Sequence, residues 1–529
     1  MSKLLYALVA AFGLAQAYWP TWTSGFDRMQ AERGDSMHLN YVLEHQFRHL
    51  VGHPRAVGSY WSPGYFHPMP DGLAYSENLL GTLPIYALAR LAVAPATAFQ
   101  LWGMALLLLN FGAMLWALRR LGVRPWLAAA GGFVFSFALT RVGHLSHQHM
   151  LPHFAAPIAL WAAVSWFEAP RLRAWIALWS ALALQVLMSL HLGWFLLFAL
   201  AVWFAVRWLC EASAWRRISA WLRAERRSAV VTVVLAVGLV SALLWPYAAA
   251  RRTYGARDDG QVTAFAPRLG SWLAAPSGSI PAALGLASDP KAPYFWEHEL
   301  FLGSVPLALG ALALGCNLRR RERRRSTFAL VVAVLVIFSL SLYVPRGASA
   351  MAMSHRELGW TLWWWVWDSL PGASGMRAVG RVWSAVLPLL VLGGWLALEE
   401  QLRRRASPPW RAFAMALMVL ALAEQVRIGQ PSFDKLEYRA TVDVWRRGIP
   451  EPCRSVYFAI PASGAPWWVR QTTAMWAGLE AGKPTVNGYS SNYPPDYPPP
   501  ERAASPEEVE RWLRARSAES ACYLTPAGS

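Results

Sequence analysis

Long apolar runs recur along the first 430 positions of this chain, and they constrain its fold more than any other feature. Each run has about 17 to 22 residues, enough to cross roughly 30 Å of hydrocarbon as a helix. Hydrophobic residues make up 55% of the 529 residues and charged residues only 15%, a balance that soluble domains do not reach. Because lipid offers backbone polar groups no partner, spans of this length are helices. We therefore predict an all-α polytopic membrane protein.

About eleven spanning helices are predicted from the length of the apolar runs and the breaks between them. Their ranges are 3–19, 97–118, 125–142, 148–168, 172–189, 192–209, 229–249, 300–316, 327–344, 379–399 and 410–428. A further apolar run, 77–94, contains Pro84 and Arg90, and we interpret it as a re-entrant or interfacial helix. The first run also resembles the apolar core of a signal peptide, but we prefer an uncleaved first helix.

The basic residues behind the formal charge of +18 cluster in short connections between the apolar runs. The clusters begin at 119, 171, 215, 317 and 401. If 77–94 does not span, all of them share one side with Lys3, as the positive-inside rule requires. We therefore expect a bacterial inner-membrane protein with a cytoplasmic N-terminus and no nucleic-acid partner. The alternative, in which 77–94 spans, puts the N-terminus outside.

This topology leaves the long segments on the outer face, where binding and catalytic groups usually lie. These segments are 20–96, 250–299, 345–378 and the tail from about 429. The chain has no Walker motif and no dinucleotide-binding glycine motif. ATP-driven transport by this chain alone is therefore not expected.

The tail differs in pattern, so we separate a transmembrane domain, 1–430, from a small periplasmic α/β domain, 431–529. Its patterns predict, in order, a strand at 454–462, a helix at 469–482, a strand and turn at 483–491, a helix at 505–518 capped by Ser505 and a strand at 521–526. A loop rich in Pro and Tyr, 490–502, is expected to extend over the site. In a periplasmic tail Cys453 and Cys522 would form a disulfide.

Asp35 lies in the first outer segment and leads an amphipathic stretch, "DSMHLNYVLEHQFRHLVG". Such a helix would lie at the membrane surface with Met37, Tyr41 and Phe47 on lipid, while Asp35 and His38 face elsewhere. A carboxylate placed there can address a substrate held at the surface. The alternative is that Asp35 or Ser36 caps the helix.

Three further outer motifs can contact a sugar or a phosphate. The loop 60–81 is dense in aromatic, Pro and Gly residues, and in it we select Tyr65, His67 and Glu77 as substrate-lining residues; the alternative is an interfacial aromatic belt. Arg377 and Arg381 are one helical turn apart and can fork a phosphate, with snorkelling to the interface as the alternative.

The third motif is a His-rich stretch, "RVGHLSHQHMLPH", at 141–153. Its spacings of three and four would suit a metal on a helix, but Pro152 interrupts the run and neither Cys nor an acid accompanies it. We therefore expect no zinc site, and assign His144, together with His191 of the next outer hairpin, to hydrogen bonding with a phosphate or sugar.

These features resemble a family. The outer "GD" before a helix, "FHPMPDGLAYSENLLGTLP", "HELFLGSVPLALG", "MRAVGRVW" and "GKPTVNGYSSNYP" are similar to motifs of the bacterial GT-C superfamily of multi-pass glycosyltransferases. The resemblance implies a polyprenyl-phosphate-linked sugar donor, transfer on the periplasmic side and an acid in the first outer loop. Asp35 is the matching position, and Asp27 and Glu32 are nearby substitutes. The loop lacks a paired-acid motif, which leaves use of a divalent cation, Mg²⁺ or Mn²⁺, open.

The predicted mechanism has Asp35 as the base that deprotonates the acceptor hydroxyl. Arg377 and Arg381, assisted by His191 or His144, would stabilise the departing phosphate. The remaining residues expected to line the substrate are His38, Asn487 and Tyr489. The acceptor is an unidentified glycan, lipid or protein. Two alternatives remain: a lipid-linked glycan transporter or flippase, for which Glu424 is the main titratable candidate, and a non-catalytic envelope polysaccharide assembly protein.

Overall fold

The computed structural model describes residues 2–257, 259–291, 294–318, 326–340, 362–405, 407–460 and 465–526. Three predicted features therefore lie partly or wholly outside the described residues. They are most of the Arg cluster that begins at 317, the end of the predicted span 327–344, and positions 345–361 of an outer segment.

Within the described residues, six helical segments are long and apolar enough to cross a membrane, and five shorter apolar helices accompany them. The longer segments are Pro95–Arg120, Pro125–Val142, Gln148–Glu168, Leu190–Cys210, Arg226–Leu243 and Val379–Arg404. The shorter helices are α1 (Ser2–Ala17), α9 (Leu172–Met188), α15 (Ser304–Leu318), α16 (Ser326–Ser339) and α19 (Pro408–Ala423). Each predicted span overlaps one of these segments, so the mostly helical architecture is confirmed; how many of them cross the membrane stays a prediction.

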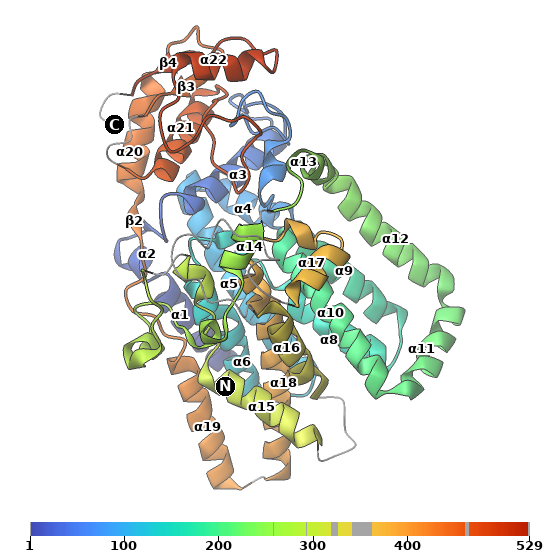
Figure 1. Cartoon of the computed structure of the whole chain (residues 1–529). Helices are drawn as coiled ribbons and strands as arrows, with labels where there is room; N and C mark the ends of the chain where they lie inside the picture. Colours follow the sequence, from blue (N-terminus) through green and yellow to red (C-terminus); the bar gives the residue numbers. More distant parts are fainter. Residues whose placement is uncertain are drawn as a thin grey trace.

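The longer segments are built from the following helices. They are α5 (Pro95–Arg120), α6 (Pro125–Phe137), α7 (Leu139–Val142), α8 (Ala155–Glu168), α10 (Leu190–Cys210), α12 (Arg226–Leu243) and α18 (Trp383–Arg404). Helix α18 is buried along its length and packs against α6, α10, α15 and α16. By contrast, α12 is largely exposed and forms an arm with α11 (Ala212–Ala224) at one side of the bundle (Figure 1).

The apolar run 77–94 contains only one α-helix, α4 (Leu83–Arg90), preceded by a 3₁₀ turn. A helix of this length reaches about 12 Å, far less than the hydrocarbon thickness. Arg90 donates hydrogen bonds to the buried Glu44 carboxylate, which holds α4 against the helix of the first outer segment. The α-helix in this run is thus too short to span the membrane.

The remaining helices are short and lie in the connecting segments. They are α2 (Trp19–Thr23), α13 (Pro246–Tyr254), α14 (Asp259–Phe265), α17 (Trp363–Ser369), the 3₁₀ helices η1 (Gly72–Tyr75), η2 (Leu80–Thr82), η3 (Gln148–Met150), η4 (Leu269–Leu273), η6 (Phe295–His298), η8 (Ala373–Gly375) and η9 (Val379–Val382), and a π-helix, η5 (Ala282–Leu286).

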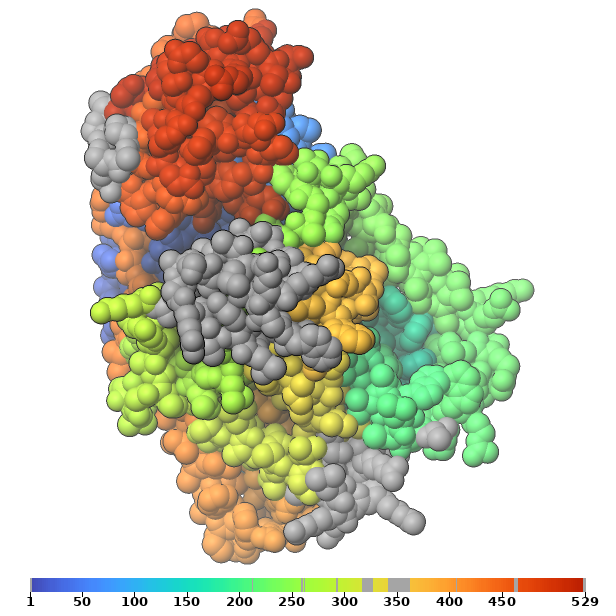
Figure 2. Space-filling model, in the orientation of Figure 1, coloured from blue at the N-terminus to red at the C-terminus, as the bar shows by residue number. Residues whose placement is uncertain are grey.

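The tail caps one end of the molecule (Figures 1 and 2). It contains α20 (Lys435–Arg447), α21 (Trp467–Ala481) and α22 (Pro506–Arg514), with strands β3 (Val456–Phe458) and β4 (Cys522–Leu524) paired in parallel. A second pair, β1 (Arg28–Met29) with β2 (Phe433–Asp434), is antiparallel and joins the first outer segment to the start of the tail.

The predicted tail elements compare well with these. Strands, both helices and the capping box of Ser505 with Glu508 are confirmed, and Cys453 is bonded to Cys522 with Cα atoms 5.8 Å apart. The predicted strand at 483–491 is reduced to a single bridge between Thr485 and Val456. Helix α20 was not predicted.

Helix α3 (Asp35–Leu50) lies beneath this tail, and here the predicted lipid-facing surface is wrong. Met37, Tyr41 and Phe47 are each at most 7% exposed. The Trp476 indole of α21 donates to the Met37 carbonyl at 2.9 Å, so the tail covers the face that was expected to contact lipid.

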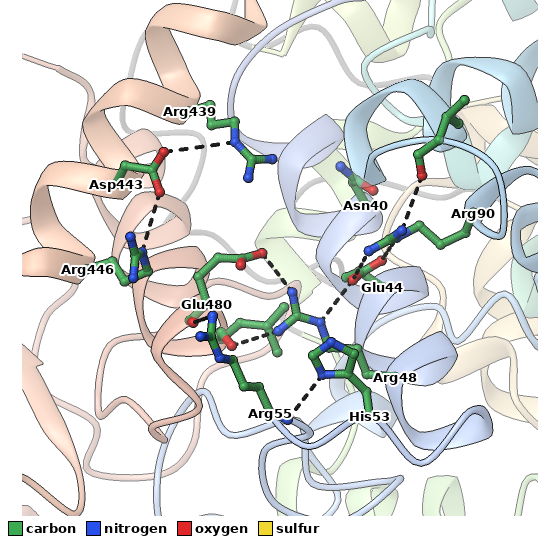
Figure 3. A network of polar contacts seen from close by, with 12 residues as sticks. Asn40, Glu44, Arg48, His53, Arg55, Arg90, Arg439, Asp443, Arg446 and Glu480 are labelled. Atoms are coloured by element: carbon green, nitrogen blue, oxygen red, sulfur yellow. Dashed lines mark hydrogen bonds and ion pairs between the residues drawn. The ribbon is translucent and has the colours of Figure 1, made fainter. Parts of the chain in front are cut away.

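Ion pairs tie α3 to its neighbours as well (Figure 3). The Arg48 guanidinium donates to Glu44 at 2.9 Å, to Glu480 of α21 at 2.7 Å and to the Leu479 carbonyl at 2.8 Å. Helix α3 is packed between the helical bundle and the tail. This packing, and not amphipathic periodicity alone, decides which faces of α3 are buried.

Candidate functional site

The Asp35 carboxylate lies at the start of α3 but does not cap this helix. Glu32 accepts the backbone N–H groups of Gly34 and Asp35, both at 2.6 Å, and so caps the helix from three residues before its first residue. Asp35 instead accepts the Tyr489 hydroxyl at 2.6 Å on one oxygen, and its other oxygen lies 3.2 Å from His147 Nε2. The sequence alternative had Asp35 or Ser36 as the cap of α3, but the capping side chain is Glu32. Asp35 faces other functional groups.

Glu32 itself is close enough to Asp35 for the two carboxylates to repel. Burial, and secondly the charge of Asp35, raise the pKa of Glu32 to about 7, although the capped N–H groups oppose this. Among the predicted acids, Asp27 is exposed and lies apart from this environment. Asp35 is therefore the acid of the loop that meets the functional cluster.

A buried ion pair forms the opposite side of the site. Arg381 donates to Glu297 at 3.0 Å and contacts His149 Nε2 at 3.0 Å, and its side chain and that of Glu297 are 7% and 2% exposed. Burial alone would raise the pKa of Glu297, but Arg381, with His147 and His144, outweighs it and holds that pKa below the ordinary value.

Arg377 lies in the loop before η9, so the predicted arrangement of two Arg on one helical face is wrong. Burial, and then repulsion from Arg381, lower the pKa of Arg377, while Glu297 and Asp35 oppose this. The guanidinium lies 5.4 Å from the centre of the Phe265 ring. Within the described part of the chain it makes no hydrogen bond or ion pair, so its donors are free for a ligand.

Arg257 is the third member of what we call the arginine cluster, Arg257, Arg377 and Arg381. Burial, and then repulsion from the other two, lower the pKa of Arg257 to about 10. Its guanidinium donates to the Ser491 carbonyl at 2.9 Å and to the Asn492 side chain at 2.5 Å. Sequence reasoning missed Arg257 and Glu297. The signal for Arg257 was the same as for the other two: an Arg on the predicted outer side, against the usual charge bias.

Four His side chains lie between the carboxylate and the arginine cluster. Successive ring centres of His144, His147, His149 and His191 are about 6 Å apart. Burial lowers the pKa of His147 and of His144, with Asp35 opposing this at His147, so both are neutral hydrogen-bonding groups at pH 7. His191 Nδ1 lies 2.5 Å from Glu77, whose carboxylate also accepts the Leu190 and His191 backbone N–H groups. Glu77 thus caps α10 and orients His191.

The other predicted lining residues divide into two sets. His38 packs edge-on against Tyr489, and burial lowers its pKa to about 4, so it lies behind Asp35 as a neutral ring. Tyr65 donates to the Gly72 carbonyl within the buried core. His67 and Asn487 lie at the seam with the tail: the His67 N–H donates to Thr485, and the Asn487 amide pairs with the Phe458 backbone. The second set, Tyr65, His67 and Asn487, bonds to other parts of the protein and so has a structural role.

Chemically, the arrangement places a carboxylate that can accept a proton beside a group of cations that can hold an anion. No group of three His, Cys, Asp or Glu positioned to hold a metal occurs within the ranges that the structure describes. In the His-rich stretch, His153 contacts Arg141 Nη2 at 3.0 Å, pointing away from the other imidazoles.

Comparisons with known proteins bear on the fold. No protein-family model matches the chain, and no curated protein matches it. Among solved structures, the arabinofuranosyltransferase AftD from Mycobacteria matches with a TM-score of 0.53 and 17% identity, over 92% of this chain and 32% of AftD. The chain shares its fold with this arabinofuranosyltransferase, as expected from the resemblance of its motifs to those of multi-pass glycosyltransferases. It spans about a third of the length of AftD, and at this identity the likeness defines the fold alone.

Two further structures match over most of this chain. ArnT from Cupriavidus metallidurans in the apo state has a TM-score of 0.46 and 13% identity, over 92% of this chain and 86% of ArnT. The same ArnT bound to undecaprenyl phosphate has a TM-score of 0.40 and 14% identity, over 90% of this chain and 71% of ArnT. In this chain the carboxylate of Asp35, in the first outer segment, contacts His147, and the nearby His149 contacts Arg381.

Proposed function

We propose that this protein is a membrane glycosyltransferase that transfers a sugar from a polyprenyl-phosphate-linked donor to an acceptor hydroxyl, with Asp35 as general base. One observation carries the proposal. The Asp35 carboxylate lies 3.2 Å from His147 Nε2, and the ring of His149, 5.9 Å from that of His147, contacts Arg381 at 3.0 Å. A base and an anion-binding group side by side are what displacement of a phosphate from a sugar requires.

In the proposed reaction, Asp35 takes the proton of the acceptor hydroxyl as its oxygen attacks the anomeric carbon. The new carbon–oxygen bond forms while the bond from that carbon to the phosphate oxygen breaks, and the electron pair leaves with the polyprenyl phosphate. His147, 3.2 Å from Asp35, and the Tyr489 hydroxyl hold the carboxylate in place. A group fixed in this way needs little reorganisation in the transition state.

The arginine cluster is assigned to the phosphate. Arg377 has free donors, whereas Arg381 and Arg257 are already fixed by Glu297 and by the loop at Ser491 and Asn492. Arg377 would therefore make the bidentate contact with phosphate oxygens, and the other two would add positive charge in a water-poor setting. His149, whose Nε2 accepts from Arg381, can donate from Nδ1, whereas His191, whose Nδ1 bonds Glu77, would donate from Nε2 only when protonated.

The proposed orientation of the protein in the membrane rests on its Arg clusters and its disulfide. The Arg clusters of the short connections indicate a cytoplasmic side together with the N-terminus, which puts the polar cluster and the tail on the periplasmic face of a bacterial inner membrane. The disulfide between Cys453 and Cys522 supports this, because such bonds persist in oxidising compartments.

The test is an assay of the purified full-length chain in lipid nanodiscs with a radiolabelled polyprenyl-phospho-sugar. Asp35→Asn should lower sugar release or transfer by about 10² to 10⁴-fold while donor binding is retained. Arg377→Gln should instead weaken binding of the polyprenyl phosphate about tenfold. Matched controls are Asp289→Asn and Arg252→Gln, which alter exposed residues outside the cluster. Chelation of divalent cations in the same assay tests for Mg²⁺ or Mn²⁺.

Full activity of Asp35→Asn would refute the proposal in favour of a scaffold or assembly role. Loss with Asp27→Asn but not with Asp35→Asn would reassign the base. The transporter alternative is not favoured, because the Glu424 carboxylate accepts the backbone N–H groups of Ser304 and Val305 and so caps α15.

A further inference from the structure

A second cavity lies on the other side of α3 from Asp35. Its volume is about 520 Å³, within the usual range of small-ligand sites. Met37 and Asn40 line it from α3. They follow Asp35 by two and five residues. On a helix of 3.6 residues per turn, these positions lie on roughly the opposite side from Asp35. None of the arginine cluster lines this cavity, so the two sites are separate.

Its walls are mainly apolar. The apolar part includes Phe26 from the first outer segment, residues 94–96 at the start of α5, Val442 of α20 and Trp476 of α21. An apolar chain would fill such a space with favourable burial.

Two residues of the cavity lining, Asn40 and Tyr438, have a buried polar atom without a hydrogen-bond partner in the part of the chain that the structure describes. Asn40 is fully buried, and its Nδ2 makes no hydrogen bond within the described part of the chain, while its Oδ1 accepts the Tyr86 hydroxyl at 3.3 Å. A buried amide without a partner costs free energy that a ligand acceptor would recover. Figure 3 shows Asn40 on one side of the polar network and Arg439 and Glu480 on the other, and all three residues line the cavity.

Two charged side chains of the cavity lining are bonded within the protein. The Lys435 ammonium donates to Thr97 and Gln100 at 2.8 and 2.9 Å, and Glu480 pairs with Arg48. Arg439, the other cation of the lining, lies 3.9 Å from Asp443, and its side chain is 58% exposed.

The cavity lies at one boundary of the apolar helices. Gly25, Phe26 and Asp27 line it directly after α2, whose Trp19 and Trp22 are 60% and 44% exposed. Exposed Trp at the end of a membrane helix marks the lipid interface, and α5 begins at the same cavity. Ester carbonyls of phospholipids lie at this depth.

We propose that the cavity between α3, α5, α20 and α21 binds the ester-linked acyl chain of a membrane phospholipid, with Asn40 Nδ2 donating to the ester carbonyl. The chain occupies the apolar space and the head group stays outside. A lipid held there packs the tail helices and α3 onto the membrane surface.

The test uses the full-length chain in nanodiscs of phosphatidylethanolamine and phosphatidylglycerol with a small amount of phosphatidylethanolamine that carries a diazirine on its acyl chain. After illumination, digestion and mass spectrometry locate the label. We expect label on the residues of the cavity wall. Ala96→Trp, which fills the cavity, should reduce it about tenfold, and Asn40→Leu, which removes the donor, about three- to tenfold. Ala440→Trp, on the exposed side of α20, is the matched control and should label as the parent protein does.

An ether-linked analogue, which lacks the carbonyl, should label the parent protein as weakly as the ester lipid labels Asn40→Leu. Equal labelling by ether and ester lipids, labelling that survives Ala96→Trp, or labelling of this wall by a polyprenyl-phosphate probe instead would overturn the proposal. Thermal unfolding of each variant shows that it is folded. The assay needs no turnover, so its failure leaves the proposed transferase reaction untouched.

Discussion

The Tyr489 hydroxyl donates a 2.6 Å hydrogen bond to the Asp35 carboxylate across 454 residues of sequence. Two residues further on, Ser491 and Asn492 bind Arg257 and the Tyr75 carbonyl. The same short loop of the tail therefore touches both the acid and the arginine cluster. The tail is part of the site, and its contribution can be measured.

Tyr489→Phe removes only the hydroxyl that holds Asp35. A hydrogen bond to a charged group contributes roughly 1.5–3 kcal/mol, so kcat should fall about tenfold or more. The KM for the donor should stay constant, because Tyr489 touches the base and not the arginine cluster. Tyr523→Phe, whose hydroxyl binds the Ala504 carbonyl in the tail, is the control. An unchanged kcat in Tyr489→Phe would show that the bond does not position the base.

Arg381→Met should destabilise the fold because it leaves Glu297 buried without its partner. The expected loss in the free energy of unfolding is about 3 kcal/mol. Adding Glu297→Met should restore most of it, since the isolated charge is then gone. Arg403→Met, which breaks an exposed pair with Glu399, should change stability by less than about 1 kcal/mol. Thermal unfolding in detergent measures the stability of the parent protein and of the three variants. Equal losses in Arg381→Met and in the double variant would contradict the interpretation.

The Glu32 carboxyl predicts a pH dependence of stability. Its pKa is about 7 in the folded chain, raised by burial and by Asp35, against about 4.3 in an unfolded chain. The unfolded state therefore loses this proton first, and the free energy of unfolding falls as pH rises from about 4 and levels off above about 7. Allowing for partial exposure, the change is about 2 kcal/mol.

Glu32→Gln keeps an acceptor oxygen for the Gly34 and Asp35 N–H groups but does not titrate. Its unfolding temperature should change less between pH 5 and 8 than that of the parent protein. Parallel pH profiles of the two proteins would show that Glu32 is not the titrating group.

Removing the disulfide should loosen the tail. Cys453 and Cys522 are 69 residues apart, and losing the bond between them should cost roughly 2–5 kcal/mol. Cys453→Ser with Cys522→Ser should be cut faster in the tail by a protease, and transferase activity should fall as the Tyr489 loop loses order. Cys210→Ser, at the end of α10, is the control. Proteolysis at the parent rate would rule out this role.

The sequence by itself determined the helical membrane architecture and most of the tail. Apolar length, Arg clusters and the Ser505 capping box are local signals. Each predicted span overlaps an apolar helix, and α21, α22 and β4 lie where their local patterns placed them. Asp35, Arg377 and Arg381 were also found from local features, since an acid or an Arg on the outer side departs from the surrounding composition.

Only the tertiary structure decided how these groups meet. The burial of α3 depends on the tail packing over it, and periodicity within α3 does not report what lies above it. Arg257 and Glu297 join the site through loops whose path is set by long-range contacts with Ser491 and Arg381. Local patterns encode the preferences of a segment, whereas a polar cluster depends on pairs of residues hundreds of positions apart, and that pairing exists only once the chain has packed.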